Sequence, residues 1–490
     1  MKIQTGNKSL SLKTRILKIG AAPLLFLVTS LLSGLFFVYN VPIGYGNDEG
    51  VHVLKASAIS YGDIFSDPLG KGTTPEGNEV TTYGVAAHVD IANLEHASGP
   101  ARKIAECDPQ SFCTQPSPEI KDKIQDLAGA DVDESSVTFI DLMGANIYNP
   151  IAYIPSAAFI KIGNLLDLSA GNIVMLARLG SLLAFIVLSF WAIYLLRNSR
   201  AKWIVFCIAL MPGSIVAAAS VGVDSVLNGI ALLVFALIIR VFTKEGLSTP
   251  LRIVLITGGL LLPLLKLPYA IISMAILFLP IYPSALKGWL TRFGLGTAML
   301  LPALYWTIVT SGPNTTQSLW VHAGSTPPNT HDQIMFIISH PIAYLESLIK
   351  TPLVNDWAGG LGALTHQVNL QLPSLLLLFG FLLTLLAAWM AVQDISSRHK
   401  KRFNYLMFAV PTLSVLGIAS ALYVAFNPVG AEIIEGVQGR YFFPILPFIA
   451  IAVALLIPVK LSLQHLTRLF AAGNIAILLL TCFWYFSVVY

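Results

Sequence analysis

The chain has 490 residues, of which 55% are hydrophobic and 11% are charged, and its mean hydropathy is +0.72. This composition excludes an ordinary soluble protein and indicates a chain that crosses a membrane several times. The formal net charge of +4 is divided among small basic clusters between apolar stretches, which argues for membrane topology and against a nucleic-acid partner.

The apolar stretches predict about eleven transmembrane helices, because roughly 20 apolar residues cross the hydrocarbon core of a bilayer. Residues 1–18 are basic and are therefore expected in the cytoplasm. They are followed by no convincing signal cleavage site, so residues 19–40 should remain as the first span. Every later short basic loop falls on the same side, which places the C-terminus outside. The predicted spans are 19–40, 173–196, 203–219, 225–242, 251–267, 269–286, 293–310, 371–392, 404–425, 441–459 and 470–488.

Two long polar segments separate these spans and define the predicted domains. The first is an outer loop at 41–172 within a membrane module at 19–310, the second is an outer loop at 311–370, and C-terminal helices at 371–490 include an outer loop at 426–440. Charge alternation works only if the short apolar segment 148–166 does not cross, so we predict a juxtamembrane helix there. A second amphipathic stretch covers Ile334–Leu348. The predicted fold class is an all-α integral membrane protein with two large extracytoplasmic loops.

The four cysteines fall into two pairs. Cys207 and Cys482 lie inside apolar spans and are interpreted as core residues. Cys107 and Cys113 lie in the polar first loop, and their surroundings do not match a zinc site. We therefore predict a local disulfide in an oxidising compartment.

The stretch Asn47-Asp48-Glu49-Gly50-Val51-His52 directly follows the first span, so two carboxylates and an imidazole should lie at the outer membrane surface. Such groups are suited to acid–base chemistry. The structural alternative is that Asn47 caps a helix whose positive end is favoured by Asp48 and Glu49. If the helix starts at Asn47, Asp48 and His52 share one face. The stretch by itself leaves both interpretations open.

Three charged residues elsewhere should lie at the same membrane face. Asp224 follows a predicted span, Lys266 interrupts an apolar run, and Arg178 lies six residues into a span. Charges at a membrane edge usually face protein or a water-filled cavity. The alternatives are helix capping for Asp224 and snorkelling toward the headgroups for the two cations.

The stretch Glu435-Gly-Val-Gln438-Gly439-Arg440-Tyr441 combines a charge, glycines and an aromatic residue at the outer start of a span. Glycine lets a ligand approach the backbone, and a guanidinium group binds phosphate oxygens in a forked geometry. The alternative is a snorkelling arginine beside an aromatic belt. Taken together, the acids and cations of this face are the groups needed for transfer from a phosphorylated lipid to an outside acceptor.

The ordered set of these motifs resembles a family of predicted bacterial membrane proteins that is catalogued as a domain of unknown function and is related to the GT-C glycosyltransferases. The resemblance covers residues from about 20 to 460. It is carried by Asn-Asp48-Glu49-x-x-His52, Asn149-Pro150-x-x-Tyr153-x-Pro155 with Arg178, Met211-Pro-x(7)-Ser220-x-x-x-Asp224, Lys266-x-Pro268 and Gly436-Val-Gln438-Gly-Arg440-Tyr441. One position departs from the family pattern, because Asn47 stands where a proline usually precedes the acidic pair.

This resemblance implies an enzyme of the bacterial cytoplasmic (inner) membrane whose active site faces outward. GT-C enzymes take sugars from polyprenyl-phosphate carriers, and the acidic motif in their first outer loop supplies the catalytic base. That role carries over to Asp48, with Glu49 beside it and Asp224 as the acidic residue of the second outer loop. His52, Tyr153 and Arg178 remain further candidates for the site.

The predicted reaction is transfer of a sugar from a polyprenyl-phosphate donor to a hydroxyl group of an envelope glycan or protein, with inversion at the anomeric carbon. Arg440 and Lys266, helped by Gln438 and Tyr441, would bind the donor phosphate. No cofactor is predicted, and a divalent metal is left open. The rival functions are a transporter or flippase of lipid-linked glycans and a non-catalytic envelope scaffold.

Overall fold

The structure is a computed structural model. It describes residues 19–46, 48–73, 79–102, 118–133, 136–243, 245–282, 286–310, 329–354, 359–365, 370–459 and 466–490. Asn47 and the predicted disulfide pair Cys107 and Cys113 lie outside the described residues. Of the other two cysteines, Cys207 is buried and Cys482 is partly buried, and both are free thiols.

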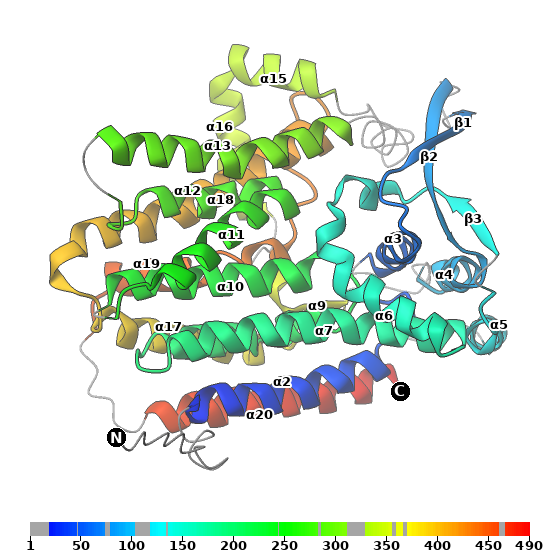
Figure 1. The fold of residues 1–490 in the computed structure, drawn as a ribbon, viewed down its shortest axis with the longest axis horizontal. Coiled ribbons are helices and arrows are strands. Elements are labelled where there is room, and N and C mark those ends of the chain that lie inside the picture. The colour runs from blue at the N-terminus through cyan, green and yellow to red at the C-terminus, as the bar shows by residue number, and fades with distance from the viewer. Residues whose placement is uncertain are drawn as a thin grey trace, which may run out of the picture.

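Seven described helices are long and apolar enough to cross a membrane. Figure 1 shows that the axes of most of them lie side by side, roughly along the long axis of the molecule. Their apolar side chains are stable only in contact with other protein segments or with lipid. They are α2 (Ala21–Asn40), α7 (Ala170–Leu195), α10 (Val223–Phe242), α13 (Leu286–Val309), α17 (Ser374–Val392), α18 (Lys400–Phe426) and α20 (Leu466–Val489).

Shorter helices replace four of the predicted spans, so the expected count of about eleven is not confirmed. Predicted span 203–219 is divided into α8 (Lys202–Ala209) and α9 (Pro212–Ala218). Predicted span 269–286 begins at the last residue of η3 (Leu267–Tyr269) and contains α12 (Ala270–Leu277). The other two are α11 (Thr249–Leu265) and α19 (Leu446–Leu456). Prolines stand in the first turn of α9, η3 and α19. Because proline has no backbone N–H, it is accepted there but interrupts a continuous helix.

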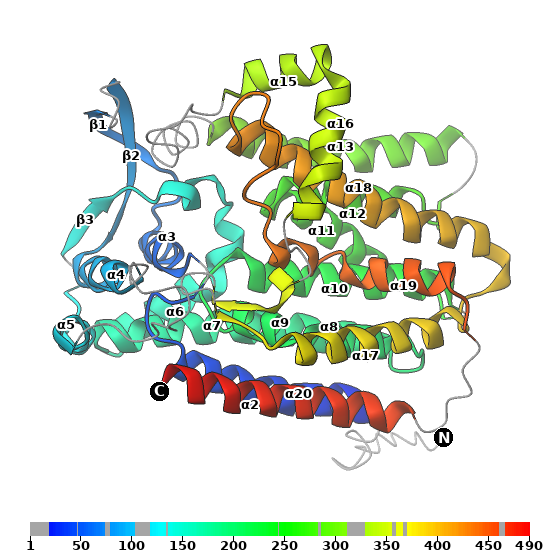
Figure 2. The ribbon, with the colours of Figure 1, turned by 180° about the vertical axis from the view of Figure 1, so that it is seen from behind.

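Helix α10 lies in the centre of the bundle and is buried along most of its length. It packs between α7 and α11, which Figure 1 shows on either side of it. Gly229 permits a close approach to α7, since a Cβ at this position would lie 2.9 Å from the Cβ of Leu188. On the opposite side of the molecule, α17, α18 and α19 cover the core, as seen in Figure 2. The N-terminus of α10 is thereby held at one end of a packed bundle.

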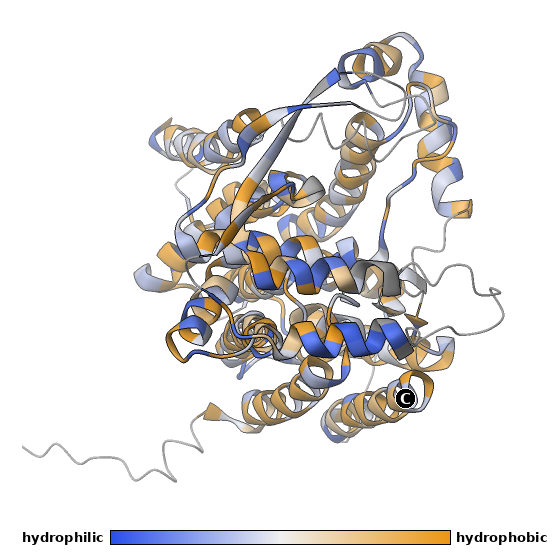
Figure 3. Ribbon diagram, turned by 90° about the vertical axis from the view of Figure 1, so that its right-hand side faces the viewer, coloured by the Kyte–Doolittle hydropathy of each residue, from blue (hydrophilic) through white to orange (hydrophobic). Residues whose placement is uncertain are grey.

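One end of the bundle carries a lobe that the sequence did not predict. A three-stranded antiparallel sheet is formed by β1 (Asp67–Thr73), β2 (Glu79–His88) and β3 (Val137–Ile140), in that order. It adjoins α3 (Glu49–Tyr61) and α4 (Val89–Arg102), and α5 (Pro118–Gly129) packs on α4. Figure 3 looks onto this lobe and shows hydrophilic stretches on its helices and strands. The chain is mostly helical, but the prediction of an all-α fold is wrong for this loop.

The second predicted outer loop also contains strands. Its described parts are α15 (Thr330–Ser339), α16 (Pro341–Val354), η4 (Gly359–Gly362), β4 (Ala363–Thr365) and β5 (Leu370–Gln371). The predicted amphipathic stretch therefore consists of two helices. The side-chain amide of Gln333 fixes α15 to α18 by donating to the carbonyl of Tyr423 at 2.9 Å.

The segment predicted as a juxtamembrane helix is η2 (Pro150–Tyr153) followed by α6 (Ile154–Leu165), and η1 (Met143–Ile147) precedes it. At 12 residues α6 is only about 18 Å long, which is too short to cross a bilayer. It packs antiparallel on α7: the hydroxyl groups of Ser156 and Ser181 lie 2.8 Å apart, and Gly163 adjoins Ile173. The segment thus forms a helical hairpin with α7.

Candidate functional site

Four charged side chains from four separate segments meet where the bundle adjoins the lobe. Asp48 precedes α3, Asp224 lies in the first turn of α10, Lys266 follows α11, and Arg440 lies in η7 (Gly439–Phe442). We call these residues the charge cluster. The sequence predicted that these four and Glu49 line one site. The structure brings the four together, although 392 positions separate the first from the last.

The charge cluster alternates acids and bases. Arg440 donates from Nη2 to Asp48 Oδ2 at 2.6 Å, and its Nη1 lies 3.6 Å from Asp224 Oδ2. Lys266 donates from Nζ to the other oxygen of Asp224 at 2.8 Å. Each cation therefore keeps donor atoms that these contacts do not use, because a guanidinium group has five N–H bonds and an ammonium group has three. These donors are available for an oxyanion.

Asp48 is the most accessible member of the charge cluster. Its side chain is 43% exposed, whereas the side chains of Asp224, Lys266 and Arg440 are each 13% exposed. It occupies the N-cap position of α3 in the left-handed region, at φ 54°, and its side chain makes no capping hydrogen bond. Asp tolerates this conformation better than most residues. The carboxylate accepts from Arg440 instead of capping the helix, and Asn47, the cap of the structural alternative, lies outside the described residues.

Asp224 and Arg440 are positioned by local backbone features. Asp224 lies in the first turn of α10, where the helix dipole favours a negative charge, and it makes two ionic contacts. It does not cap the helix, because Gly222 occupies the N-cap position without a side-chain capping bond. Gly439 presses η7 against η4, since a Cβ there would lie 2.0 Å from the carbonyl carbon of Gly360. Gln438 then accepts a hydrogen bond from Arg440 Nε at 2.5 Å. Gln438 and Asp48 thus orient the guanidinium group of Arg440 between them.

Lys266 does not snorkel, which corrects that alternative. It ends α11, and its ammonium group lies 4.7 Å from the centre of the Tyr441 ring and 5.4 Å from that of Tyr148. Tyr269 fixes this arrangement by donating its hydroxyl proton to the backbone carbonyl of Tyr441 at 2.8 Å. A cation held between aromatic faces is stabilised after water is removed.

His52 and Tyr153 form a neutral pair beside the charge cluster. His52 Nδ1 lies 2.7 Å from the Tyr153 hydroxyl, one turn of α3 beyond Asp48. Burial lowers the pKa of His52 from 6.5 to about 4, so the imidazole is neutral at physiological pH. Burial also raises the pKa of Tyr148, the next aromatic neighbour, to about 12. These residues form a polar but uncharged wall.

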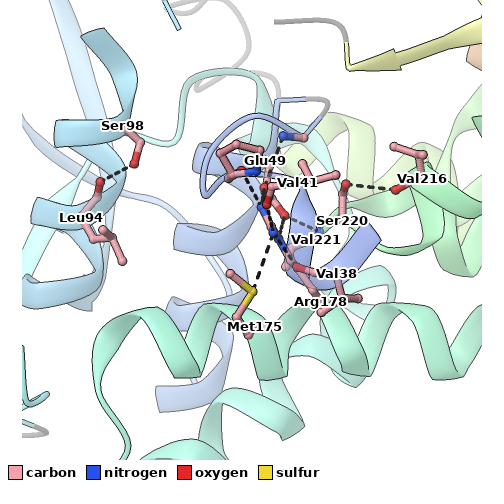
Figure 4. Close-up of polar contacts among 12 residues, drawn as sticks. Val38, Val41, Glu49, Leu94, Ser98, Met175, Arg178, Val216, Ser220 and Val221 are labelled. Atoms are coloured by element: carbon pink, nitrogen blue, oxygen red, sulfur yellow. Dashed lines mark hydrogen bonds and ion pairs between the residues drawn. The ribbon is translucent and has the colours of Figure 1, made fainter. Parts of the chain in front are cut away.

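Glu49 and Arg178 form a second ion pair outside the charge cluster, and Figure 4 shows their contacts. Arg178 donates to both carboxylate oxygens of Glu49, at 2.7 and 2.5 Å, and neither side chain is exposed. The guanidinium group also donates to the carbonyl groups of Val38, Val41 and Pro42. This pair joins the end of α2 to α3 and α7. The snorkelling alternative for Arg178 is therefore wrong, and Glu49 is turned away from the exposed carboxylate of Asp48.

An apolar cavity of about 300 Å³ opens beside Lys266. Its walls come from α11, η3, α13 and α18, together with Tyr148 and Tyr441. Lys266 and Tyr148 also line a small polar cavity of about 10 Å³ with His52, Asp224 and Arg440, so the apolar and polar spaces adjoin. Sequence reasoning did not identify Trp306, which lines the apolar cavity and donates from its indole to the carbonyl of Ile147 at 2.8 Å. A lone tryptophan near a helix end gave no spacing signal.

Within the described part of the chain, no group of three His, Cys, Asp or Glu side chains could hold a metal ion.

Comparison with curated proteins gives no match, and neither does comparison with solved structures. The family model described as a predicted membrane protein, DUF2142, matches residues 31–449, which is most of the chain. Together with the seven long apolar helices, this match shows that the chain is a multi-pass membrane protein and belongs to the DUF2142 family of predicted membrane proteins.

Proposed function

We propose that this protein transfers a sugar from a polyprenyl-phosphate donor to a hydroxyl group of a glycan or protein outside the cytoplasmic membrane of a bacterium. The observation that carries the proposal is the juxtaposition of an accessible carboxylate, two buried cations and an apolar cavity. A molecule that fits this arrangement has a phosphate head and a hydrocarbon tail. An isoprenoid chain would occupy the cavity beside Trp306, and its phosphate would lie at Lys266 and Arg440.

Asp48 acts as the general base in this mechanism. It takes the proton of the acceptor hydroxyl while the oxygen forms a bond to the anomeric carbon. The bond from that carbon to the phosphate oxygen breaks, and the electron pair leaves with the phosphate. Attack from the side opposite the leaving group inverts the anomeric centre.

Arg440 couples proton uptake by Asp48 to departure of the phosphate. It contacts Asp48 at 2.6 Å in the structure, and protonation of Asp48 removes the negative charge that holds this contact. The same step adds one negative charge to the departing phosphate. Arg440 can therefore transfer its donors from the carboxylate to the phosphate, while Asp224 keeps Lys266 in place at 2.8 Å. Preorganised cations of this kind stabilise charge where it develops.

Asp48→Asn tests the proposal. The variant preserves the shape of the side chain but removes its basicity, so we expect normal insertion and binding of polyprenyl phosphate with transfer reduced about 10²–10⁴-fold. Binding is measured by native mass spectrometry, and transfer is measured with radiolabelled polyprenyl-phosphate glucose, mannose and galactose. Asp67→Asn is the matched control, because Asp67 lies exposed on β1. Wild-type transfer by Asp48→Asn would contradict the role of Asp48. Failure of the wild-type protein to bind polyprenyl phosphate would contradict the substrate class.

Arg440→Lys tests phosphate binding separately from the base. The variant keeps the charge and loses the fork, so affinity for polyprenyl phosphate should fall by about 1–3 kcal/mol. A loss of transfer with unchanged binding would instead assign Arg440 to the orientation of Asp48.

A further inference from the structure

A second groove lies between α12 and α13, at the end of these helices away from the charge cluster. Its volume is about 480 Å³, and its walls include Phe278, Phe293, Leu301 and Leu304. Helix α13 contributes Trp306 to the apolar cavity near Lys266 and Arg292 to this groove. At 1.5 Å per residue, the 14 positions between Arg292 and Trp306 place these two side chains about 21 Å apart along α13.

Arg292, which lines the groove, has a tyrosine and a second arginine near it. Arg292 stacks on Trp289 and on Tyr282, with 5.0 and 5.6 Å from its guanidinium carbon to the ring centres. Arg252 in the first turn of α11 lies within electrostatic range of the same tyrosine. A second positive charge is therefore near the tyrosine on which Arg292 stacks.

Neither of these cations has an acidic partner among the described residues. In the described residues, Arg240 pairs with Glu245 at 2.6 Å and Arg200 with Asp394 at 3.7 Å, whereas no acidic side chain pairs with Arg252 or Arg292. Arg292 Nε and the Tyr282 hydroxyl are buried and have no hydrogen-bond partner among the described residues. Buried donors without a partner are costly, so the site is complete only with an acceptor.

The dimensions of the groove fit one lipid leaflet. The groove residues of α13 from Arg292 to Leu304 extend over about 18 Å, and half of a hydrocarbon core of about 30 Å is about 15 Å. Phe278, Trp289 and Phe293 are each more than half exposed, so the groove opens toward the bilayer. A hydrocarbon chain can lie along it while a headgroup stays at Arg292.

We propose that this groove is a binding site for an anionic phospholipid of the leaflet opposite the charge cluster, with its phosphate between Arg252 and Arg292 and an acyl chain along α13. This inference rests on the membrane-spanning helices and is independent of the sugar-transfer proposal. An anionic lipid supplies both the negative charge and the acceptor oxygens that Arg292 and Tyr282 lack.

Arg292→Gln and Arg252→Gln test the site, with Arg402→Gln as the matched control. Arg402 is exposed in the first turn of α18, and the far end of that helix lines the cavity near Lys266, so Arg402 lies at the same end of the bundle as Arg292. General attraction to anionic headgroups would be reduced equally by Arg402→Gln and Arg292→Gln, whereas loss of the site affects Arg292 and Arg252 only.

The proteins are purified into nanodiscs of phosphatidylcholine with 20% phosphatidylglycerol, and bound lipids are counted by native mass spectrometry. We expect wild type and Arg402→Gln to retain phosphatidylglycerol, and Arg292→Gln to bind it about tenfold more weakly. Arg252, which is exposed, should give a smaller loss without any effect on folding. The proposal would be overturned if Arg292→Gln and Arg402→Gln lost phosphatidylglycerol equally. It would also be overturned if the wild-type protein retained phosphatidylcholine as well as phosphatidylglycerol. Displacement of phosphatidylglycerol by polyprenyl phosphate would also overturn it and assign the groove to the carrier.

Discussion

At the level of single residues, Glu49 and Arg178 show how a buried ion pair constrains a site without entering it. Both side chains are fully buried, and Arg178 donates to Glu49 as well as to three backbone carbonyl groups. The Glu49 carboxylate also accepts from the backbone N–H groups of Gly46 and Val221. The pair therefore holds the loop that carries Asp48 against α7 and the start of α10.

Glu49→Gln should destabilise the fold rather than remove a catalytic group. The substitution leaves the Arg178 charge buried without a counter-charge, which typically costs about 3–5 kcal/mol. Glu79→Gln is the matched control: Glu79 pairs with Lys71 at 2.8 Å, but both side chains are more than 60% exposed, so the loss should stay below about 1 kcal/mol. Unfolding in detergent, followed by tryptophan fluorescence, measures the difference. Equal stability of the two variants would show that the buried pair does not support the fold.

His52 should make stability depend on pH. Its pKa is about 4 in the folded protein and 6.5 in the unfolded chain, so the unfolded state binds a proton first as the pH falls. The contribution of the neutral imidazole is fully present above pH 6.5 and is lost between pH 6.5 and pH 4, by about 3 kcal/mol at most. His52→Asn, which retains a polar atom near Tyr153, should show a smaller decrease in Tm from pH 7 to pH 5. Parallel Tm curves for wild type and variant would contradict the assignment.

The sequence predicted which charged residues lie close together better than it predicted the partner of each side chain. Asp48, Asp224, Lys266 and Arg440 stood out because a charge beside an apolar span is costly unless it is partnered, and the structure gives each one an opposite charge. Adjacency of Asp48 and Glu49 suggested a shared role, but the turn into α3 directs their side chains to different partners. That direction depends on tertiary contacts, which a sequence pattern does not encode.

At the level of elements, short 3-10 turns and helix ends carry the site. Arg440 lies in η7, Lys266 lies between α11 and η3, and Tyr148 lies between η1 and η2. The apolar pattern identified the helices correctly where they are long and uninterrupted, as in α2 and α20. The predicted span count is not confirmed where prolines divide an apolar run, because hydropathy averages over such breaks. The apolar pattern also missed β1–β3: β1 contains a proline and two glycines, and β3 has only four residues.

Gly439→Ala should disrupt the site through the contact between η7 and η4. The added Cβ would lie 2.0 Å from the carbonyl carbon of Gly360 and 2.3 Å from the amide nitrogen of Leu361, and backbone atoms cannot move as a side chain can. We expect a lower Tm and weaker polyprenyl-phosphate binding, because Arg440 follows directly. Gly294→Ala in α13 is the control, since nothing lies within 4 Å of its added Cβ and alanine favours the helix. Unchanged lipid binding by Gly439→Ala would show that η7 adjusts without displacing Arg440.

At the level of the whole molecule, the ends of the bundle differ in charge. Helices α10 and α11 run in opposite directions, so Asp224 and Lys266 lie at one end while Arg240 and Arg252 lie at the other. Arg197, Arg200 and the basic start of α18 also follow or precede long helices. With the basic segments retained on the cytoplasmic side, we expect the lobe and the charge cluster to lie outside. The sugar-transfer proposal requires this orientation, because the acceptor is an envelope hydroxyl group.

Cysteine accessibility decides the orientation. In a variant without native cysteines, His331→Cys on α15 and Arg402→Cys on α18 place one exposed thiol at each predicted face. A membrane-impermeant maleimide should label position 331 in intact cells and position 402 only after permeabilisation. Both positions should react in detergent, which controls for burial of the thiol. Labelling of both positions in intact cells, or of position 402 alone, would place the charge cluster away from the envelope and contradict the proposed acceptor, whatever lipid the apolar cavity binds.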